Sequence, residues 1–365
     1  MRIESVDVYE LVIPFHDGGD GFGLTPQRWD RFETVLLRIT TEDGLVGWGE
    51  CFSYACQSAV SAALRDMVVP LLLGQDAWDP AALMLEVQRK LHLFGRYGIT
   101  IFAISGADTA LWDLKARSSG VPLAQLLGPS LRDTVPSYAS LVRYGRPDLV
   151  EHFAAKAVDE GYRSVKLHEV TVEAIHAGRR GAGAQTHLTV DTNCAWTAEQ
   201  AERSLPRIEE AQPAWIEEPL FPPEDFEALA SLASRTRIPL AAGENACTAV
   251  EFARMIRVRA VTYPQPSVTK VGGVTEFASV LKLAERAGLT CMPHSPYFGP
   301  GYWATLQLLA VAPGQPYLER LYVEPAGMSG LGTPLPKRGI VAIPTGAGIG
   351  FEPDWDVFER FCKRA

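Results

Sequence analysis

The chain has 365 residues, of which 47% are hydrophobic and 21% are charged. This length exceeds the roughly 250–300 residues that one hydrophobic core serves, so we expect two domains or a barrel with an appended unit. The formal net charge of −9, from 34 Lys and Arg against 43 Asp and Glu, excludes the basic surface that nucleic acid requires.

Hydropathy and cysteine spacing indicate in which cell compartment the protein is expected. The longest apolar stretch falls far short of the roughly 18 residues that span a bilayer, so no membrane partner is expected. The first residues lack the apolar region of a signal peptide, and the six cysteines form no CxxC pair. Both features favour a cytoplasmic enzyme with reduced thiols.

The first third of the chain is predicted to form an α+β domain. Predicted strands cover residues 3–14, 31–40 and 45–51, and predicted helices cover residues 58–72, 80–93 and 103–117. Asp43-Gly44 is a hairpin signal between the second and third strands. Residues 15–30 are rich in glycine and are expected to form a loop. Asp43, Asp108 and Asp113 are assigned to turn or helix-surface positions.

From about residue 135, short apolar runs alternate with helical segments. The predicted strands begin at Pro136, Ser164, His187, Trp215, Pro239, Ala260, Leu289 and Tyr317. Eight such units predict a parallel sheet closed into a (β/α)8-type barrel. An open doubly wound sheet is the alternative, but no GxGxxG motif opens any of the helices. Residues 321–365 return to β-like and irregular sequence that is expected to pack back on the first domain.

Three of the predicted strands end in a carboxylate. Asp191, Glu217 and Glu244 are spaced 26 and 27 residues apart. Because the C-terminal ends of barrel strands meet at one face, these acids repel one another unless a cation neutralises them. Three hard oxygen ligands suit Mg²⁺ better than zinc.

Basic and polar side chains end other strands. Lys166 and His168 lie two residues apart on one strand and therefore face the same side. His294 follows the seventh strand, across the barrel mouth. A metal ion, an ammonium group and candidate imidazole bases are the equipment for removing a proton α to a carboxylate. The other polar residues at strand ends are Ser140, Asn193, Ser267 and Glu319.

Taken together, these motifs resemble the enolase superfamily on its mandelate-racemase-like branch. The matching runs are Val190-Asp191-Thr192-Asn193, Trp215-Ile216-Glu217-Glu218-Pro219, Gly243-Glu244-Asn245, Lys270 to Thr275, Pro293-His294-Ser295 and Leu318-Glu319-Arg320. The resemblance implies an α+β capping domain (1–130), a modified TIM barrel, (β/α)7β (131–321), and a C-terminal segment (322–365) that packs back on the cap. It also implies a homo-oligomer.

The resemblance assigns roles to the candidate residues. Asp191, Glu217 and Glu244 are the implied Mg²⁺ ligands. Lys166 and His168 occupy the family's Lys-x-Lys, with His168 in place of the second lysine, while Glu319 matches the acid that hydrogen-bonds the substrate. Loops near residues 16–30 and 52–58 are implied to close over the substrate, so His16 and Tyr54 are candidate binding residues. Phe22, Trp29, Phe52 and Tyr54 predict a partly apolar lid, which disfavours the most polar diacids.

One position departs from the family pattern. The strand-seven histidine, His294, is normally oriented by an aspartate at the end of strand six, and here that position is Ser267. A neutral hydrogen bond leaves His294 a weak base but an adequate acid. We therefore expect His168 to act as the base and His294 as the acid, a difference that favours dehydration over racemisation.

The sequence predicts a Mg²⁺-dependent enzyme that acts on a small carboxylate. The leading function is proton abstraction through a metal-stabilised enediolate, followed by dehydration of a hydroxy acid such as an acid sugar to a 2-keto acid. Racemisation or epimerisation of an α-substituted carboxylate is the alternative, and lactone-forming cycloisomerisation comes third. A metal-dependent acid-binding protein without turnover is the remaining reading.

Overall fold

The chain begins with a three-stranded antiparallel sheet. β1 (Ile3–His16) pairs with β2 (Arg31–Thr41), and β2 pairs with β3 (Val46–Cys51) across the predicted hairpin, where Gly44 has a φ of 80°. The computed structural model describes residues 1–21, 29–326 and 331–363. Phe22 and the middle of the predicted 16–30 loop lie outside these ranges.

The helices that follow complete the cap, the unit that β1–β3 and these helices form. They are α1 (Gln57–Ala63), the π-helical η1 (Leu64–Val68), α2 (Val69–Leu72), α3 (Pro80–Lys90), the short 3-10 turn η2 (His92–Phe94), α4 (Gly98–Ser118) and α5 (Leu123–Leu127). Two glycines of β3 let α4 lie directly on the sheet. A Cβ on Gly49 would come within 2.0 Å of the Gly106 carbonyl oxygen, and one on Gly47 within 2.2 Å of that of Ala110.

The surface assignment of two aspartates on α4 is wrong. Asp108 and Asp113 are fully buried, because the cap sheet covers one side of α4 and α11 of the barrel covers another. Asp108 accepts a hydrogen bond from the Thr275 backbone amide, and Asp113 accepts one from the Trp48 amide. These hydrogen bonds hold α4 against α11 and the cap sheet.

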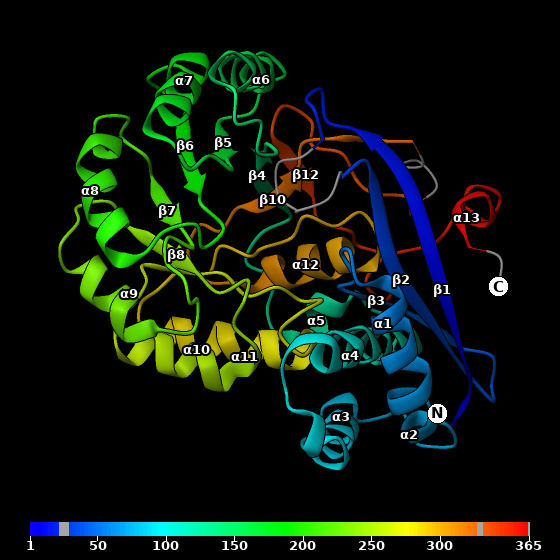
Figure 1. The fold of residues 1–365 in the computed structure, drawn as a ribbon. Helices are drawn as coiled ribbons and strands as arrows, with labels where there is room; N and C mark the ends of the chain where they lie inside the picture. The colour runs from blue at the N-terminus through cyan, green and yellow to red at the C-terminus, as the bar shows by residue number, and fades with distance from the viewer. Residues whose placement is uncertain (22–28, 327–330, 364–365) are drawn as a thin grey trace.

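Parallel strands and helices alternate through the barrel (Figure 1). The strands are β4 (Thr134–Ser140), β5 (Ser164–Leu167), β6 (His187–Asp191), β7 (Trp215–Glu217), β8 (Leu240–Ala242), β9 (Tyr263–Pro264) and β10 (Leu318–Leu321). The helices are α6 (Pro147–Asp159), α7 (Val172–Ala182), α8 (Ala198–Glu209), α9 (Phe226–Ala233), α10 (Thr248–Arg257), α11 (Gly273–Arg286) and α12 (Pro300–Val311). The sheet runs in the order β10-β4-β5-β6-β7-β8-β9.

The strand predicted to begin at Leu289 is irregular. Met292 donates its backbone amide to the Pro264 carbonyl at 3.0 Å, and the Ser295 hydroxyl donates to the Glu319 carbonyl at 3.1 Å, so this segment lies between β9 and β10. Pro293 and Pro296 lack the backbone N–H that a regular strand ladder needs. Seven helices therefore alternate with eight strand positions in the described barrel, and the predicted modified barrel, (β/α)7β, is confirmed.

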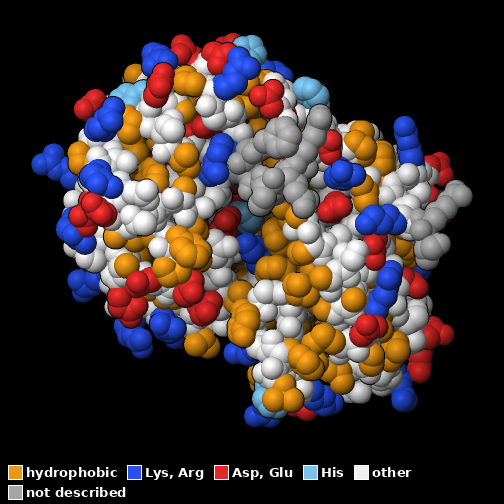
Figure 2. Space-filling view, in the orientation of Figure 1, with side chains coloured by type: hydrophobic (Ala, Val, Ile, Leu, Met, Phe, Trp, Pro, Cys, Tyr) orange, Lys and Arg blue, Asp and Glu red, His pale blue; other side chains and the backbone are white. Residues whose placement is uncertain are grey.

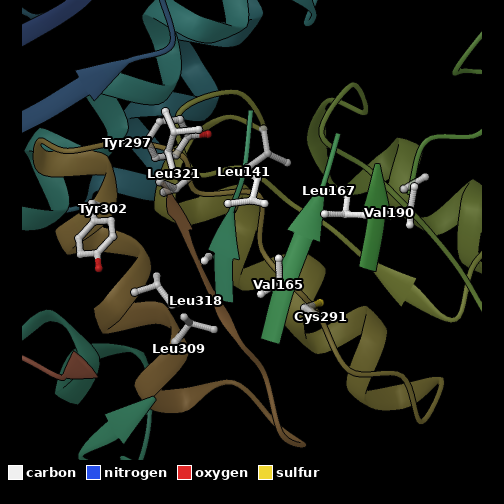
Figure 3. Packing of buried hydrophobic residues seen from close by; sticks show 14 of the residues in the cluster. Leu141, Val165, Leu167, Val190, Cys291, Tyr297, Tyr302, Leu309, Leu318 and Leu321 are labelled. Carbon is white, nitrogen blue, oxygen red and sulfur yellow. The ribbon is translucent and has the colours of Figure 1, made fainter. Parts of the chain in front are cut away.

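The period of two along each barrel strand separates core from site. Val165 and Leu167 of β5 belong to the hydrophobic layer between strands and helices (Figure 3). A Cβ on Gly178 of α7 would lie 2.3 Å from Leu167, which shows how closely that helix covers the strand. Lys166, between them, is fully buried on the opposite face, inside the barrel. The alternation thus sends one charged side chain inward from an apolar strand.

The C-terminal segment joins both parts of the molecule. β11 (Glu324–Pro325) pairs with β1, whereas β12 (Ile340–Ala342) pairs with β4 of the barrel. α13 (Trp355–Phe361) returns to the cap, where the Phe358 ring lies 5.1 Å from that of Tyr9. The domain boundaries near residues 130 and 321 stay predictions. Among the described helices, we find none long and apolar enough to cross a membrane.

Candidate active site

A cavity of about 750 Å³ lies where the cap meets the C-terminal ends of the barrel strands. Figure 2 shows this face hollowed between the two parts, with acidic, basic and histidine side chains visible inside and hydrophobic ones beside them. The predicted site residues that line the cavity are Tyr54, Ser140, His168, Asn193, Glu244, His294 and Glu319. The barrel therefore gathers side chains that are far apart in the sequence.

The three predicted metal ligands meet at the barrel side of this cavity. Asp191 and Glu217 are direct partners in the pairing of β6 with β7, and Glu244 follows β8. Each offers a carboxylate oxygen within 4.8 Å of the other two. Gln265 and Trp215 donate hydrogen bonds to Glu217 Oε2, at 2.7 and 3.3 Å, and fix that carboxylate.

Lys166 lies among these carboxylates. Its Nζ is 2.9 Å from Asp191 Oδ2, 2.6 Å from Glu217 Oε1 and 3.1 Å from Glu319 Oε1. Burial acts to lower the pKa of Lys166, but the three carboxylates outweigh it and hold that pKa well above its ordinary value. The ammonium group therefore stays charged.

The single positive charge of Lys166 does not balance the negative charge of the carboxylates around it. Burial raises the pKa of Glu217 well above its usual range, and the neighbouring Asp191 and Glu319 carboxylates add to the effect despite Lys166. A divalent cation relieves such a concentration of buried negative charge. Three carboxylate oxygens within coordinating reach of one another also form the hard donor set that Mg²⁺ prefers. The donor set and its charge thus fit a Mg²⁺ ion.

His168 presents an acceptor nitrogen to the site. Its Nδ1 contacts the carbonyl oxygen of Leu141, so Nδ1 carries the hydrogen and donates it. The lone pair of the neutral ring is then on Nε2, which lies 3.3 Å from Asp191 Oδ2. The imidazole is arranged to take up a proton at the edge of the carboxylate group.

His294 is arranged in the opposite sense. Its Nε2 lies 2.8 Å from Glu244 Oε2, which makes Nε2 the hydrogen donor. Its Nδ1 lies 3.2 Å from both the Ser267 and Tyr297 hydroxyl oxygens, which also contact each other. Hydroxyl groups both donate and accept, so they suit the ring with or without a hydrogen on Nδ1, and His294 offers an N–H at Nε2.

Glu319 makes hydrogen bonds to several residues at the centre of the barrel. It accepts hydrogen bonds from the Ser140 hydroxyl at 2.8 Å and from the Ser295 backbone amide at 2.9 Å, besides its contact with Lys166. Burial opposes ionisation of Glu319, but Lys166 and the histidines outweigh it and lower the pKa of this carboxyl. Ser140 therefore acts on Glu319, and Glu319 faces the cavity as an anion.

The remaining predicted binding residues differ in position. Tyr54 lines the cap side of the cavity, and its hydroxyl oxygen is buried and has no hydrogen-bond partner among the described residues. Asn193 lines the cavity and accepts a hydrogen bond from Arg143 at 2.8 Å. His16 is not brought to this site: it lines a separate, smaller pocket beside Phe153.

Sequence reasoning gave no role to four residues at this site. Arg143 donates to the His168 carbonyl at 2.6 Å, Gln265 fixes Glu217, Tyr297 contacts His294, and Lys270 lines the cavity. Gln265 and Lys270 flank Ser267 at the end of the sixth strand, so a search for polar residues near strand ends could have found them. Tyr297 comes from an irregular loop that no periodicity marks.

Comparison with known proteins supports the same set of motifs. Residues 27–128 match the family "Mandelate racemase / muconate lactonizing enzyme, N-terminal domain", and residues 149–357 match "Enolase C-terminal domain-like". The arabinonate dehydratase of Saccharolobus solfataricus is 28% identical over 99% of this chain and 100% of its own length. The D-galactarolactone cycloisomerase of Agrobacterium fabrum is 30% identical over 99% of both chains.

Solved structures show the same architecture. A racemase from Streptomyces coelicolor A3(2), with bound magnesium, superimposes with a TM-score of 0.89 and 27% identity, over 99% of this chain and 100% of that one. The two family matches together cover most of the chain, the cap as well as the barrel.

Proposed function

The chain belongs to the mandelate racemase and muconate lactonizing enzyme family of the enolase superfamily, and on that premise we propose that it dehydrates an acid sugar to a 2-keto acid with Mg²⁺. The observation that carries this proposal is the unlike state of the two histidines. His168 Nδ1 donates to a backbone carbonyl, which leaves Nε2 of the neutral ring as an acceptor, whereas the hydroxyl groups at Nδ1 of His294 allow its hydrogen to lie on Nε2. Elimination of water needs one base and one acid.

Asp191, Glu217 and Glu244 would hold the Mg²⁺ ion. When bound, the ion supplies Lewis-acid stabilisation of the negative charge that develops on the substrate carboxylate. Lys166 adds a fixed positive charge beside the same carboxylate. Its burial in the barrel gives that charge more effect than it has in water.

The chain's own residues would then move two protons. His168 Nε2 takes the proton from the α-carbon, and the electron pair left behind forms a double bond to the β-carbon. The bond from the β-carbon to its hydroxyl breaks, and His294 in its doubly protonated form donates the Nε2 proton that releases this group as water, which leaves the neutral imidazole. The enol that remains rearranges to the 2-keto acid. Glu319, fixed by Ser140, hydrogen-bonds the substrate, as would Asn193 and Tyr54.

Acid-sugar chemistry is supported by the relatives. The arabinonate dehydratase and the D-galactarolactone cycloisomerase both take their names from sugar acids or their lactones. Racemisation is the second candidate, because imidazoles lie at both ends of the carboxylate row and a similar structure is that of a racemase. The homo-oligomeric state and the cytoplasmic location stay predictions.

Incubation with Mg²⁺ and a panel of acid sugars in D₂O tests the proposal. We expect a 2-keto acid product from at least one of them. His168→Ala should abolish both product formation and deuterium uptake at the α-carbon. His294→Asn should retain deuterium uptake and lose product, whereas the exposed His92→Ala is the control and should behave as wild type.

Two results would contradict this proposal. Deuterium uptake at the α-carbon without a keto acid product would favour the racemase. Neither uptake nor product across the panel, with acid binding intact, would favour a binding protein without turnover.

A further inference from the structure

Among the residues that the structure describes, no acidic side chain contacts the buried ammonium group of Lys270. Lys270 lies in the turn before α11, its side chain lines the cavity, and only 7% of the residue is exposed. Within the described residues, its ammonium group makes no hydrogen bond and no ion pair. The nitrogen lies over the face of the Phe52 ring, 4.7 Å from the ring centroid.

The contrast with Lys166 shows how unusual this is. The ammonium of Lys166 touches three carboxylates, as a buried charge normally must. Lys270 influences Glu244 and Glu218 through space only, at distances beyond an ion pair. A cation held in a cavity wall without a partner indicates that its partner is a ligand.

The surroundings of Lys270 are fixed by the cap. The Phe52 backbone amide donates to the Thr269 carbonyl at 3.3 Å, which holds the cap segment against the Lys270 turn. The Phe52 ring in turn packs against those of Phe102 and Tyr54, at 5.0 and 6.0 Å. These rings exclude water from one side of the ammonium, and a low-dielectric wall strengthens its attraction to an anion.

We propose that Lys270 binds a second carboxylate of the substrate, so that the substrate is a sugar diacid. This inference rests on the proposed function for the first carboxylate, which lies at Lys166 and the metal ligands. The cavity of about 750 Å³ is lined by Lys270 and also by Glu244 and Glu319, which belong to or contact the carboxylate group around Lys166. A neutral hydroxyl would leave the charge of Lys270 uncompensated.

The positions of the aromatic side chains in the structure are compatible with a diacid substrate. The sequence prediction treated the aromatic side chains as walls that a polar substrate avoids. In the structure, Phe52 covers the ammonium group itself and so favours an anion beside it. We therefore propose a diacid in place of the expected preference against diacids.

Binding of matched acids tests this inference without turnover when every protein titrated, including the one that is wild type at residue 270, also carries His168→Ala, which blocks the proposed reaction. Galactarate and galactonate differ only in whether the sixth carbon is a carboxylate or a hydroxymethyl group, and glucarate and gluconate form a second such pair. Titration calorimetry in the presence of Mg²⁺ should show that the wild-type protein prefers the diacid of at least one pair. Lys270→Met should weaken diacid binding by about 10–100-fold, the effect of one charge-assisted hydrogen bond, and monoacid binding by less than about 3-fold.

Controls separate recognition from general electrostatics. Lys270→Arg should keep most of the diacid preference, and Lys282→Met, an exposed lysine on α11, should leave both affinities unchanged. Equal loss for monoacid and diacid in Lys270→Met, or no preference in the wild type, overturns the inference. A variant that fails to fold is replaced by Lys270→Gln, to which the same criteria apply.

The outcome is distinguishable from failure of the proposed function. If diacid binding depends on Lys270 while no acid exchanges its α-proton, the proposed reaction is wrong and the inference holds. If keto acid forms from monoacids as readily as from diacids, the reaction holds and the inference is wrong.

Discussion

His294 is held by two hydroxyl groups rather than by a carboxylate. Ser267 and Tyr297 both approach its Nδ1 at 3.2 Å, from the end of strand six and from the loop that carries His294 itself. A carboxylate at this position would take the hydrogen of Nδ1 and leave the lone pair on Nε2. The hydroxyls permit the opposite tautomer, with the hydrogen on Nε2. Whether His294 acts as an acid or as a base therefore depends on the side chains that face its Nδ1.

Ser267→Asp should therefore turn His294 from an acid into a base. An aspartate beside Nδ1 makes the ring more basic, so that it gives up a proton less readily, and in the neutral ring it accepts the Nδ1 hydrogen and leaves the lone pair on Nε2. We expect keto acid formation to fall by about 100-fold, the lower part of the range for a general acid, while deuterium uptake at the α-carbon persists. Ser267→Ala is the matched control, because Tyr297 still holds the ring. Unchanged dehydration in Ser267→Asp would count against the acid role of His294.

The metal-ligand set is the part of the site that single residues predict best. Asp191, Glu217 and Glu244 each end an apolar run, and the parallel barrel brings such ends together regardless of loop structure. Tyr297 and the partnerless state of Lys270 depend on how irregular segments fold. No short-range pattern encodes those contacts, so they required coordinates.

Strands and helices were predicted well where one face is buried and the other is exposed. The barrel strands from β4 to β9 lie within about three residues of the predicted starts, and the three cap strands match closely. The helix predicted over 103–117 lies within α4, but its start was placed five residues late and two of its aspartates were wrongly assigned to the surface, because α4 is buried on several sides. The prediction was also wrong for the seventh strand, where prolines interrupt the ladder. α13 was not predicted at all.

Glu50 of β3 links two elements from different parts of the molecule. Its carboxylate accepts hydrogen bonds from the Thr34 hydroxyl of β2 at 2.9 Å and from the Gly301 amide of α12 at 2.8 Å. Burial raises the pKa of Glu50 from 4.5 to about 7, against the effect of these hydrogen bonds. The contact between cap and barrel is therefore sensitive to pH.

The pH dependence has a definite sign. The folded protein keeps a proton on Glu50 that the unfolded chain releases, so the associated stability is complete below about pH 4.5 and is lost as the pH rises through about 7. A shift from 4.5 to about 7 corresponds to about 3 kcal/mol. Urea unfolding at pH 5.5 and pH 8 should show this loss for the wild type and a smaller one for Glu50→Gln. Equal losses in the two proteins would refute the assignment.

The whole molecule places an acidic site between two parts of the chain that both contribute to it. The barrel supplies the carboxylates and histidines, and the cap supplies Tyr54 and Phe52. The net charge of −9 gave no hint of the substrate, because the local charge balance depends on Lys166, Lys270 and the proposed Mg²⁺ ion rather than on the total. The fold class was predictable from alternation and motifs, whereas the shape of the cavity was not.

Mg²⁺ should stabilise the entire protein, since the ligands come from three strands that meet only in the folded barrel. At about 100 times its dissociation constant, a ligand of the folded state adds about 2.7 kcal/mol. We expect thermal unfolding to shift upward by a few degrees with Mg²⁺ and to return with a chelator. Glu217→Gln should lose the shift and the activity together, and the exposed Glu86→Gln should keep both. A shift retained in Glu217→Gln would place the ion elsewhere.

The pairing of β1 with late parts of the chain has a consequence during synthesis. β1 leaves the ribosome before β11 and α13, the segments that later pair with its end at Phe15 and His16 and pack on its face. At about 5–20 residues per second, β1 waits on the order of half a minute for its partners. Until then β1 is an open strand edge next to apolar side chains such as Leu11, the kind of surface that binds chaperones or other nascent chains. The segment that finishes the cap is thus also the one that ends this exposure.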